Sequence, residues 1–112
     1  MQELYLTRRQ QIETDKILYL ESDVNYTKIY TINQSKILSA YTLGVLQLRL
    51  DSHSFIRVNR SYIINLSYLS TYRHENNKLI IQLTGGQEFT ASRRRLKTFS
   101  NIFTDISKDL SW

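Results

Sequence analysis

The sequence predicts a mostly β domain that contains two short helical segments. Apolar and polar residues alternate in twos along much of the chain, pairs of Asn or Gly interrupt this alternation, and only two segments show helical spacing. The length of 112 residues suits one compact domain, and 41% hydrophobic residues suffice for a core. We therefore interpret residues 1–112 as a single domain.

The N-terminal part of the chain carries the first predicted strands. β-branched and aromatic residues alternate there with polar ones, which is typical of strands with one buried face. In the segment Lys16–Glu21, alternation places Ile17 and Tyr19 on one face and Leu18 and Leu20 on the other. The three alternating segments are Glu3–Thr7, Lys16–Glu21 and Tyr26–Ile32.

A short helix is predicted near residues 42–50. Leu43, Leu46 and Leu50 recur at spacings of three and four residues, which places them on one helical face. Thr42 precedes the first of them and can cap the helix, since its hydroxyl can accept a hydrogen bond from the first turn. This segment breaks the alternation that precedes it.

Two hairpin turns are predicted in the second half. Asn tolerates the positive φ angles of tight hairpin turns, and Gly adopts them at no steric cost. The first turn, Glu75–Lys78, connects Leu69–Arg73 to Leu79–Leu83, and the second, Thr84–Gln87, leads into Glu88–Ala91.

Helical spacing returns at the C-terminus and predicts a helix near residues 92–106. Leu96, Phe99, Ile102 and Ile106 repeat at intervals of three or four, and Ser92 is a suitable N-cap. Three arginines fill the first turn, where the helix dipole disfavours positive charge. Because backbone N–H groups also point outward at a helix N-terminus, these arginines indicate a phosphate site.

The charge of the chain lies in its second half. Residues 1–56 carry six acidic and six basic residues, whereas residues 57–112 carry four and nine, so this half accounts for the whole +5. Such asymmetry favours a polyanionic partner, although a basic surface can also serve solubility. The absence of cysteine excludes disulfides, cysteine zinc clusters and thiol catalysis, and suits a reducing cytoplasm.

Nothing in the sequence predicts an enzyme, a cofactor or a metal site. His53 and His74 have no neighbour at ligand or triad spacing, and no phosphate loop or nucleophile motif occurs. Glu21 and Asp23 stand two residues apart and could form a carboxylate pair or a weak metal site. No apolar stretch approaches the roughly 18 residues that span a bilayer, so no membrane partner is expected.

Three polar segments are candidates for binding nucleic acid, and each has a simpler alternative. Ser92–Arg95 offers guanidinium groups that match phosphate oxygens or the guanine edge, or it forms a solvated basic face. In Phe55–Ser61, Ile56 and Val58 are expected to point inward, so that the polar residues lie on the other face. These polar residues contact DNA, or they form an ordinary exposed strand face. The segment Asp23–Lys28 is a polar loop whose residues could instead serve the turn and the core.

Taken together, these segments resemble the LytTR-type DNA-binding domain, the output module of many bacterial response regulators. Their order and spacing match the family, and the likeness covers about residues 3–103. The motifs that carry it are Ile17-Leu18-Tyr19-Leu20-Glu21 with Asn25-Tyr26, then Phe55-Ile56-Arg57-Val58-Asn59-Arg60-Ser61-Tyr62-Ile63-Ile64-Asn65, and finally Ala91-Ser92-Arg93-Arg94-Arg95.

The resemblance implies short antiparallel strands arranged in small sheets. It also implies sequence-specific binding of double-stranded DNA for transcription regulation, through loops rather than a recognition helix. Many family members carry His where this chain has Asn59, which retains hydrogen bonding but cannot become charged. By position, the DNA-binding residues would be Asn25, Tyr26, Thr27 and Lys28 in a first loop, Arg57, Asn59 and Arg60 in a central loop, and Ser92, Arg93, Arg94 and Arg95 in a third.

The family context implies further expectations about partners. Family members commonly follow a receiver domain, for which residues 1–15 are too short, so we expect a stand-alone regulator or a piece of a longer protein with a sensor kinase or receiver partner. Binding to paired repeats would allow a dimer on DNA. Two other functions stay open: a protein-interaction module that uses exposed strand edges, and a β domain that stacks single-stranded nucleic acid or RNA on its eight tyrosines.

Overall fold

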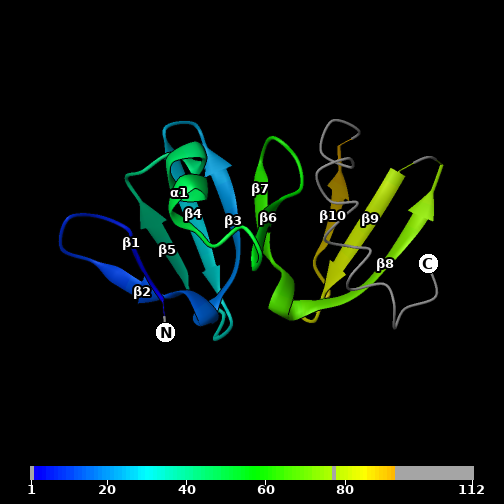
Figure 1. The fold of residues 1–112 in the computed structure, drawn as a ribbon, viewed down its shortest axis with the longest axis horizontal. Coiled ribbons are helices and arrows are strands. Elements are labelled where there is room, and N and C mark those ends of the chain that lie inside the picture. The colour runs from blue at the N-terminus through cyan, green and yellow to red at the C-terminus, as the bar shows by residue number, and fades with distance from the viewer. Residues whose placement is uncertain (1, 77, 93–112) are drawn as a thin grey trace.

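Three antiparallel sheets make up the domain in a computed structural model that describes residues 2–76 and 78–92. Figure 1 shows the two-stranded sheet and the helix toward one end of the molecule and the three-stranded sheet toward the other. The sheets, in spatial order, are β1 (Glu3–Tyr5) and β2 (Gln11–Glu13); β5 (Lys36–Ser39), β4 (Tyr26–Thr31), β3 (Ile17–Asp23), β7 (Tyr62–Asn65) and β6 (Phe55–Arg57); and β10 (Glu88–Ala91), β9 (Lys78–Leu83) and β8 (Leu69–Glu75). The predicted mostly β fold with small sheets is confirmed.

Each face of the five-stranded sheet contributes to a separate core. One face packs against the first strand and the helix α1 (Leu43–Arg49), and the other packs against the three-stranded sheet. Two single 3₁₀ turns, Thr14–Lys16 and Leu66–Tyr68, lead into β3 and β8. The first core contains Leu4, Leu6, Ile17, Leu20, Ile29, Leu43, Leu46, Leu50, Phe55 and Ile63. The second contains Leu18, Ile56, Val58, Ile64, Leu79, Ile81, Leu83, Phe89 and Ala91.

The helix α1 confirms the prediction near residues 42–50. The Thr42 hydroxyl accepts a hydrogen bond from the Val45 N–H at 3.4 Å, as an N-cap does. Leu43, Leu46 and Leu50 are buried, so the predicted apolar face is the packed one. No helix in residues 2–76 and 78–92 is long and apolar enough to cross a membrane.

The alternation predicted for Lys16–Glu21 is wrong at its start, because β3 contains an irregularity. The pairing of β3 with β4 shifts by one residue between Ile17 and Tyr19. Such a bulge inserts an extra residue into one strand and exchanges the faces beyond it. As a result, Ile17 and Leu20 share the core beneath α1, while Leu18 and Tyr19 pack toward the three-stranded sheet.

Both predicted hairpins are confirmed. The first joins β8 to β9, and Asn76 in its turn has a φ of 52°. The second joins β9 to β10, and Gly86 has a φ of 92°, which favours glycine. The helix predicted near residues 92–106 lies outside the described residues, apart from its proposed cap Ser92.

Candidate nucleic-acid interface

The three polar segments meet at one edge of the molecule, the upper edge of Figure 1. They are the β3–β4 turn (residues 24–25), the β6–β7 loop (residues 58–61) and the end of β10 at Ser92. The topology explains the meeting, because β7 is antiparallel to both β3 and β6. Backbone hydrogen bonds join the β6–β7 loop to the ends of β3 and β10: the Ser22 N–H donates to the Ser61 carbonyl at 2.8 Å, and the Ser92 N–H donates to the Val58 carbonyl at 2.9 Å.

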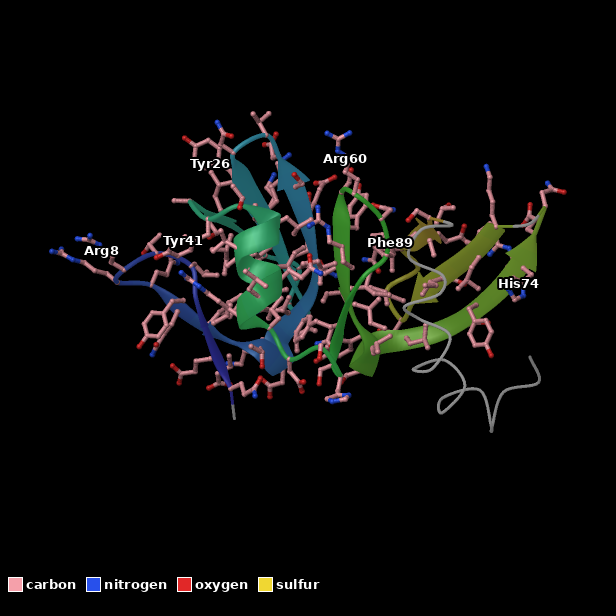
Figure 2. The ribbon with its side chains drawn as sticks, turned by 45° about the horizontal axis from the view of Figure 1, so that its top comes forward. Arg8, Tyr26, Tyr41, Arg60, His74 and Phe89 are labelled. Carbon is pink, nitrogen blue, oxygen red and sulfur yellow. The ribbon has the colours of Figure 1, made fainter. Side chains whose placement is uncertain are left out.

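The β3–β4 turn presents polar and aromatic groups to solvent. Val24 has a φ of 56° and is 85% exposed, and Asn25 beside it is exposed as well. Tyr26 begins β4 and is 50% exposed; Figure 2 shows it at the same edge as Arg60. An exposed tyrosine next to an amide side chain can contact sugars, phosphates or base edges.

The next two residues of this segment are held within the protein. Thr27 is fully buried, and its hydroxyl donates to the Tyr41 carbonyl at 2.8 Å. Lys28 is partly buried, and its ammonium lies 3.6 Å from the Asp23 carboxylate. Thr27 therefore supports the turn from beneath, and Asp23 partly neutralises the charge of Lys28.

The β6–β7 loop is organised by Arg57. Its three guanidinium nitrogens donate to the Asn59 carbonyl at 3.3 Å, to the Arg60 carbonyl at 2.7 Å and to the Gln47 side-chain oxygen at 3.1 Å. The side chain thus connects the loop to α1. Arg60 itself is exposed and extends away from the protein in Figure 2, where its guanidinium group is accessible to a ligand.

The Asn59 side chain is also used within the protein. Its Oδ1 accepts hydrogen bonds from the Ser61 N–H at 2.8 Å and the Tyr62 N–H at 3.1 Å. Its Nδ2 donates to the Thr90 carbonyl at 2.9 Å. Both polar atoms of the amide therefore have intramolecular partners, whereas the family resemblance placed Asn59 among the DNA-binding residues.

The third segment is described only at its first residue. Ser92 is partly buried, and its backbone N–H is bonded to the Val58 carbonyl. Arg93, Arg94 and Arg95 lie outside the described residues, so their contribution to DNA binding stays a prediction.

Two supporting residues were missed in the sequence. Gln47 holds Arg57 from α1, and the Thr90 carbonyl holds Asn59 from β10. No local pattern indicates either residue, because each contact joins positions that are at least ten residues apart. They become apparent only when the strands and the helix are brought together.

A tyrosine–carboxylate cluster lies on β3, β4 and β7. The Tyr30 hydroxyl donates to Glu21 Oε1 at 3.0 Å and the Tyr62 hydroxyl to Glu21 Oε2 at 2.6 Å. Tyr19 stacks on Tyr30 with ring centroids 4.4 Å apart. The rings are thus used for sheet packing. Within the described residues, no group of three or more His, Asp or Glu is arranged to hold a metal ion, and Glu21 and Asp23 have different partners.

These hydrogen bonds shift the protonation equilibria of the cluster. The bond from Tyr62 is the main reason that the pKa of Glu21 is lowered, with smaller contributions from Tyr30 and nearby lysines against an opposing effect of burial. The pKa of Tyr62 is raised to about 12, first by its bond to Glu21 and then by burial. The pKa of Tyr30 is raised to about 12, chiefly by burial.

Glu21→Gln is expected to lower the free energy of unfolding at pH 7 by about 1 kcal/mol, because the hydroxyls of Tyr30 and Tyr62 lose a charged acceptor. Since the pKa of Glu21 is lower in the folded chain, ionised Glu21 stabilises the fold above its ordinary value of 4.5, and this stabilisation is lost as the pH falls through the folded pKa. Urea unfolding at pH 7 and pH 3 should therefore show the two proteins converging in acid. An equal difference at both pH values would contradict this role.

Comparison with known proteins identifies a family, two similar transcriptional regulators and a similar solved structure. Residues 7–104 match the LytTr DNA-binding domain. The chain is 33% identical over 75 residues, 66% of its length, to the CO-responsive transcriptional regulator RcoM of Rhodospirillum rubrum. It is 40% identical over 57 residues, 51% of its length, to the heme-containing CO-sensing transcriptional regulator RcoM 2 of Paraburkholderia xenovorans.

These two relatives are longer proteins, of which the chain spans 31% and 21%. Among solved structures, the fold is similar to the LytTr DNA-binding domain of a putative methyl-accepting/DNA response regulator from Bacillus cereus. That match has a TM-score of 0.74 at 21% identity and covers 91% of this chain and 94% of the other. The match across residues 7–104 includes all three polar segments at the edge. The chain belongs to the LytTr DNA-binding domain family.

Proposed function

We propose that this domain binds double-stranded DNA sequence-specifically, through the loops at one edge, and so regulates transcription. The observation that carries the proposal is the hydrogen-bonded arrangement of the end of β3, the β6–β7 loop and the end of β10. A surface that is already ordered loses less conformational entropy on binding. Exposed Arg60 and the predicted contacts of Arg93–Arg95 would supply affinity by neutralising phosphates and specificity by reading base edges.

The chemistry of α1 supports loop recognition over helix recognition. The helix has seven residues, so it is about 10 Å long. Its outward residues include Val45 and Leu48, 37% and 87% exposed, which carry no hydrogen-bond donors for base edges. Its exposed polar residues are used within the protein: Gln47 accepts a hydrogen bond from Arg57, and Arg49 lies over the Tyr41 ring at 4.3 Å. The exposed face of α1 therefore lacks the row of free polar side chains with which a recognition helix contacts base edges in the major groove.

Two alternative functions are less well supported. A single-strand or RNA reader would need a platform of exposed rings. Tyr19 and Tyr62 pack against the core between the sheets, and Tyr30 stacks on Tyr19. The exposed rings of Tyr5 and Tyr26 lie on two different sheets. A protein-interaction module would leave the arrangement of basic and amide groups at the edge without a role. We further propose that the domain is non-catalytic, acts in the cytoplasm, and can bind as two copies on paired repeats under a sensor kinase or receiver partner.

A salt-dependent binding assay tests this function. Random duplex DNA, single-stranded DNA and RNA of equal length are compared by gel shift across a salt series. We expect preference for the duplex, with log K falling against log[salt] at a slope near −5 if roughly five or six phosphates are neutralised. Preference for single strands would support the stacking alternative, and absence of binding at low salt would leave the protein-interaction alternative.

A further inference from the structure

Within the described residues, the β6–β7 loop bonds both to the end of β3 and to the end of β10. Its Ser61 carbonyl accepts from Ser22 in β3, and its Val58 carbonyl accepts from Ser92 after β10. These are backbone contacts that any residues could make. The additional bond from Asn59 Nδ2 to the Thr90 carbonyl is made by a side chain, so it depends on the identity of the residue.

The Asn59–Thr90 bond joins two different sheets. β6 is the edge strand of the five-stranded sheet, and β10 is the edge strand of the three-stranded sheet. The two strands are not paired with each other, so no ladder fixes their separation. The packing of Val58 and Ala91 in the shared core brings them together, but apolar contacts are non-directional. The directional restraint near the edge comes from the Ser92–Val58 and Asn59–Thr90 bonds.

We propose that Asn59 is a positioning residue that fixes the distance between the β6–β7 loop and the end of β10 at Ser92, and thereby the spacing of the base pairs that these two segments contact. This inference rests on the proposed function. The Oδ1 atom of Asn59 stabilises the turn by accepting hydrogen bonds from Ser61 and Tyr62, and its Nδ2 links the turn to β10 through the Thr90 carbonyl. Because successive base pairs are 3.4 Å apart, a displacement of a few ångströms shifts one reading segment by a whole base pair.

The two functions of the amide can be separated by substitution. Asn59→Asp keeps an acceptor for the Ser61 and Tyr62 N–H groups but replaces the donor to Thr90 by an oxygen that repels its carbonyl. Asn59→Ala removes both functions. Asn76→Asp adds the same negative charge at the β8–β9 turn, which lies along the same edge in Figure 1, and serves as a charge control.

The test measures tolerance to spacing on DNA. A preferred site is selected from random duplex, and affinities are measured for this site and for versions with one base pair inserted or removed between its specified positions. We expect the wild-type protein and Asn76→Asp to bind the altered sites about 10- to 100-fold more weakly, the cost of a misplaced contact. For Asn59→Asp, we expect this penalty to fall to about threefold or less. A changed base preference at one position with the spacing penalty intact would instead make Asn59 a direct base contact and overturn the proposal.

Hydrogen exchange on the free proteins provides a second, DNA-independent readout. We expect the Ser61 and Tyr62 amides to stay protected in Asn59→Asp and to lose protection in Asn59→Ala. Loss of protection in both variants would show that Asn59→Asp disrupts the turn as well as the hydrogen bond to Thr90. That result would overturn the assignment of the spacing effect to the Thr90 bond. If wild-type protein binds no duplex, the proposed function fails; if it binds with a spacing penalty that Asn59→Asp retains, only the positioning role fails.

Discussion

Replacing Arg57 by alanine is expected to weaken duplex binding about 10- to 100-fold, which corresponds to about 1.5–3 kcal/mol for the lost charged hydrogen bonds. In the wild-type protein, three guanidinium nitrogens hold the carbonyls of Asn59 and Arg60 and the side chain of Gln47. Without these three hydrogen bonds, the loop that carries Arg60 must become ordered when it binds DNA. Ordering costs roughly 1–2 kcal/mol per residue, so the loss of affinity exceeds that of one phosphate contact. Fluorescence anisotropy with a selected duplex measures the change.

Arg57→Lys distinguishes this organising role from a direct phosphate contact. Lysine keeps the positive charge but has a single ammonium group in place of a planar fork with nitrogens directed at three acceptors. If Arg57 organises the loop, the lysine variant should bind nearly as weakly as the alanine variant. Near wild-type affinity in the lysine variant would show that charge, rather than the hydrogen-bonded geometry, is what Arg57 contributes.

The largest effect on stability is expected for Leu20→Ala. Leu20 is fully buried on β3, the central strand of the five-stranded sheet, and belongs to the core beneath α1. Removing its side chain is expected to lower the free energy of unfolding by about 2–5 kcal/mol, through lost burial and the cavity that remains. Domains are typically stable by about 5–15 kcal/mol, so this single change removes a large part of the total. Urea unfolding followed by circular dichroism measures the loss.

Leu48→Ala is the matched control, because the same atoms are removed from a leucine that is 87% exposed. Its effect should stay within about 0.5 kcal/mol. Equal losses in the two variants would contradict the placement of Leu20 in the core and of Leu48 at the surface. The pair therefore checks the predicted helical face and the central strand in one experiment.

Much of the fold could be predicted because its local signals agree. Leucines at helical spacing after Thr42 predicted α1, and the Asn and Gly pairs predicted both hairpins. The three motifs together also indicated the family, which the match over residues 7–104 confirms. Three short strands, Gln11–Glu13, Lys36–Ser39 and Tyr62–Asn65, were not predicted, because three or four residues carry too little periodicity.

The exposed part of the candidate site was also predictable from residue type. Asn25, Tyr26 and Arg60 were singled out in the sequence and lie at the shared edge with accessible side chains. Thr27 and Asn59 were singled out equally, but one is buried and the other is bonded to a strand of the second sheet. Residue type indicates which hydrogen bonds a side chain can make, and only its neighbours decide which it does make.

The sequence by itself therefore determined the class of fold, the segments with special chemistry and the family. Each of these depends on residues close together along the chain or on a motif with fixed spacing. The tertiary structure alone decided the face exchange after Ile17, the role of Arg57 in ordering its own loop and the link from Asn59 to Thr90. These features depend on how strands from separate sheets are packed together, because a hydrogen bond requires its two atoms to lie within about 3 Å.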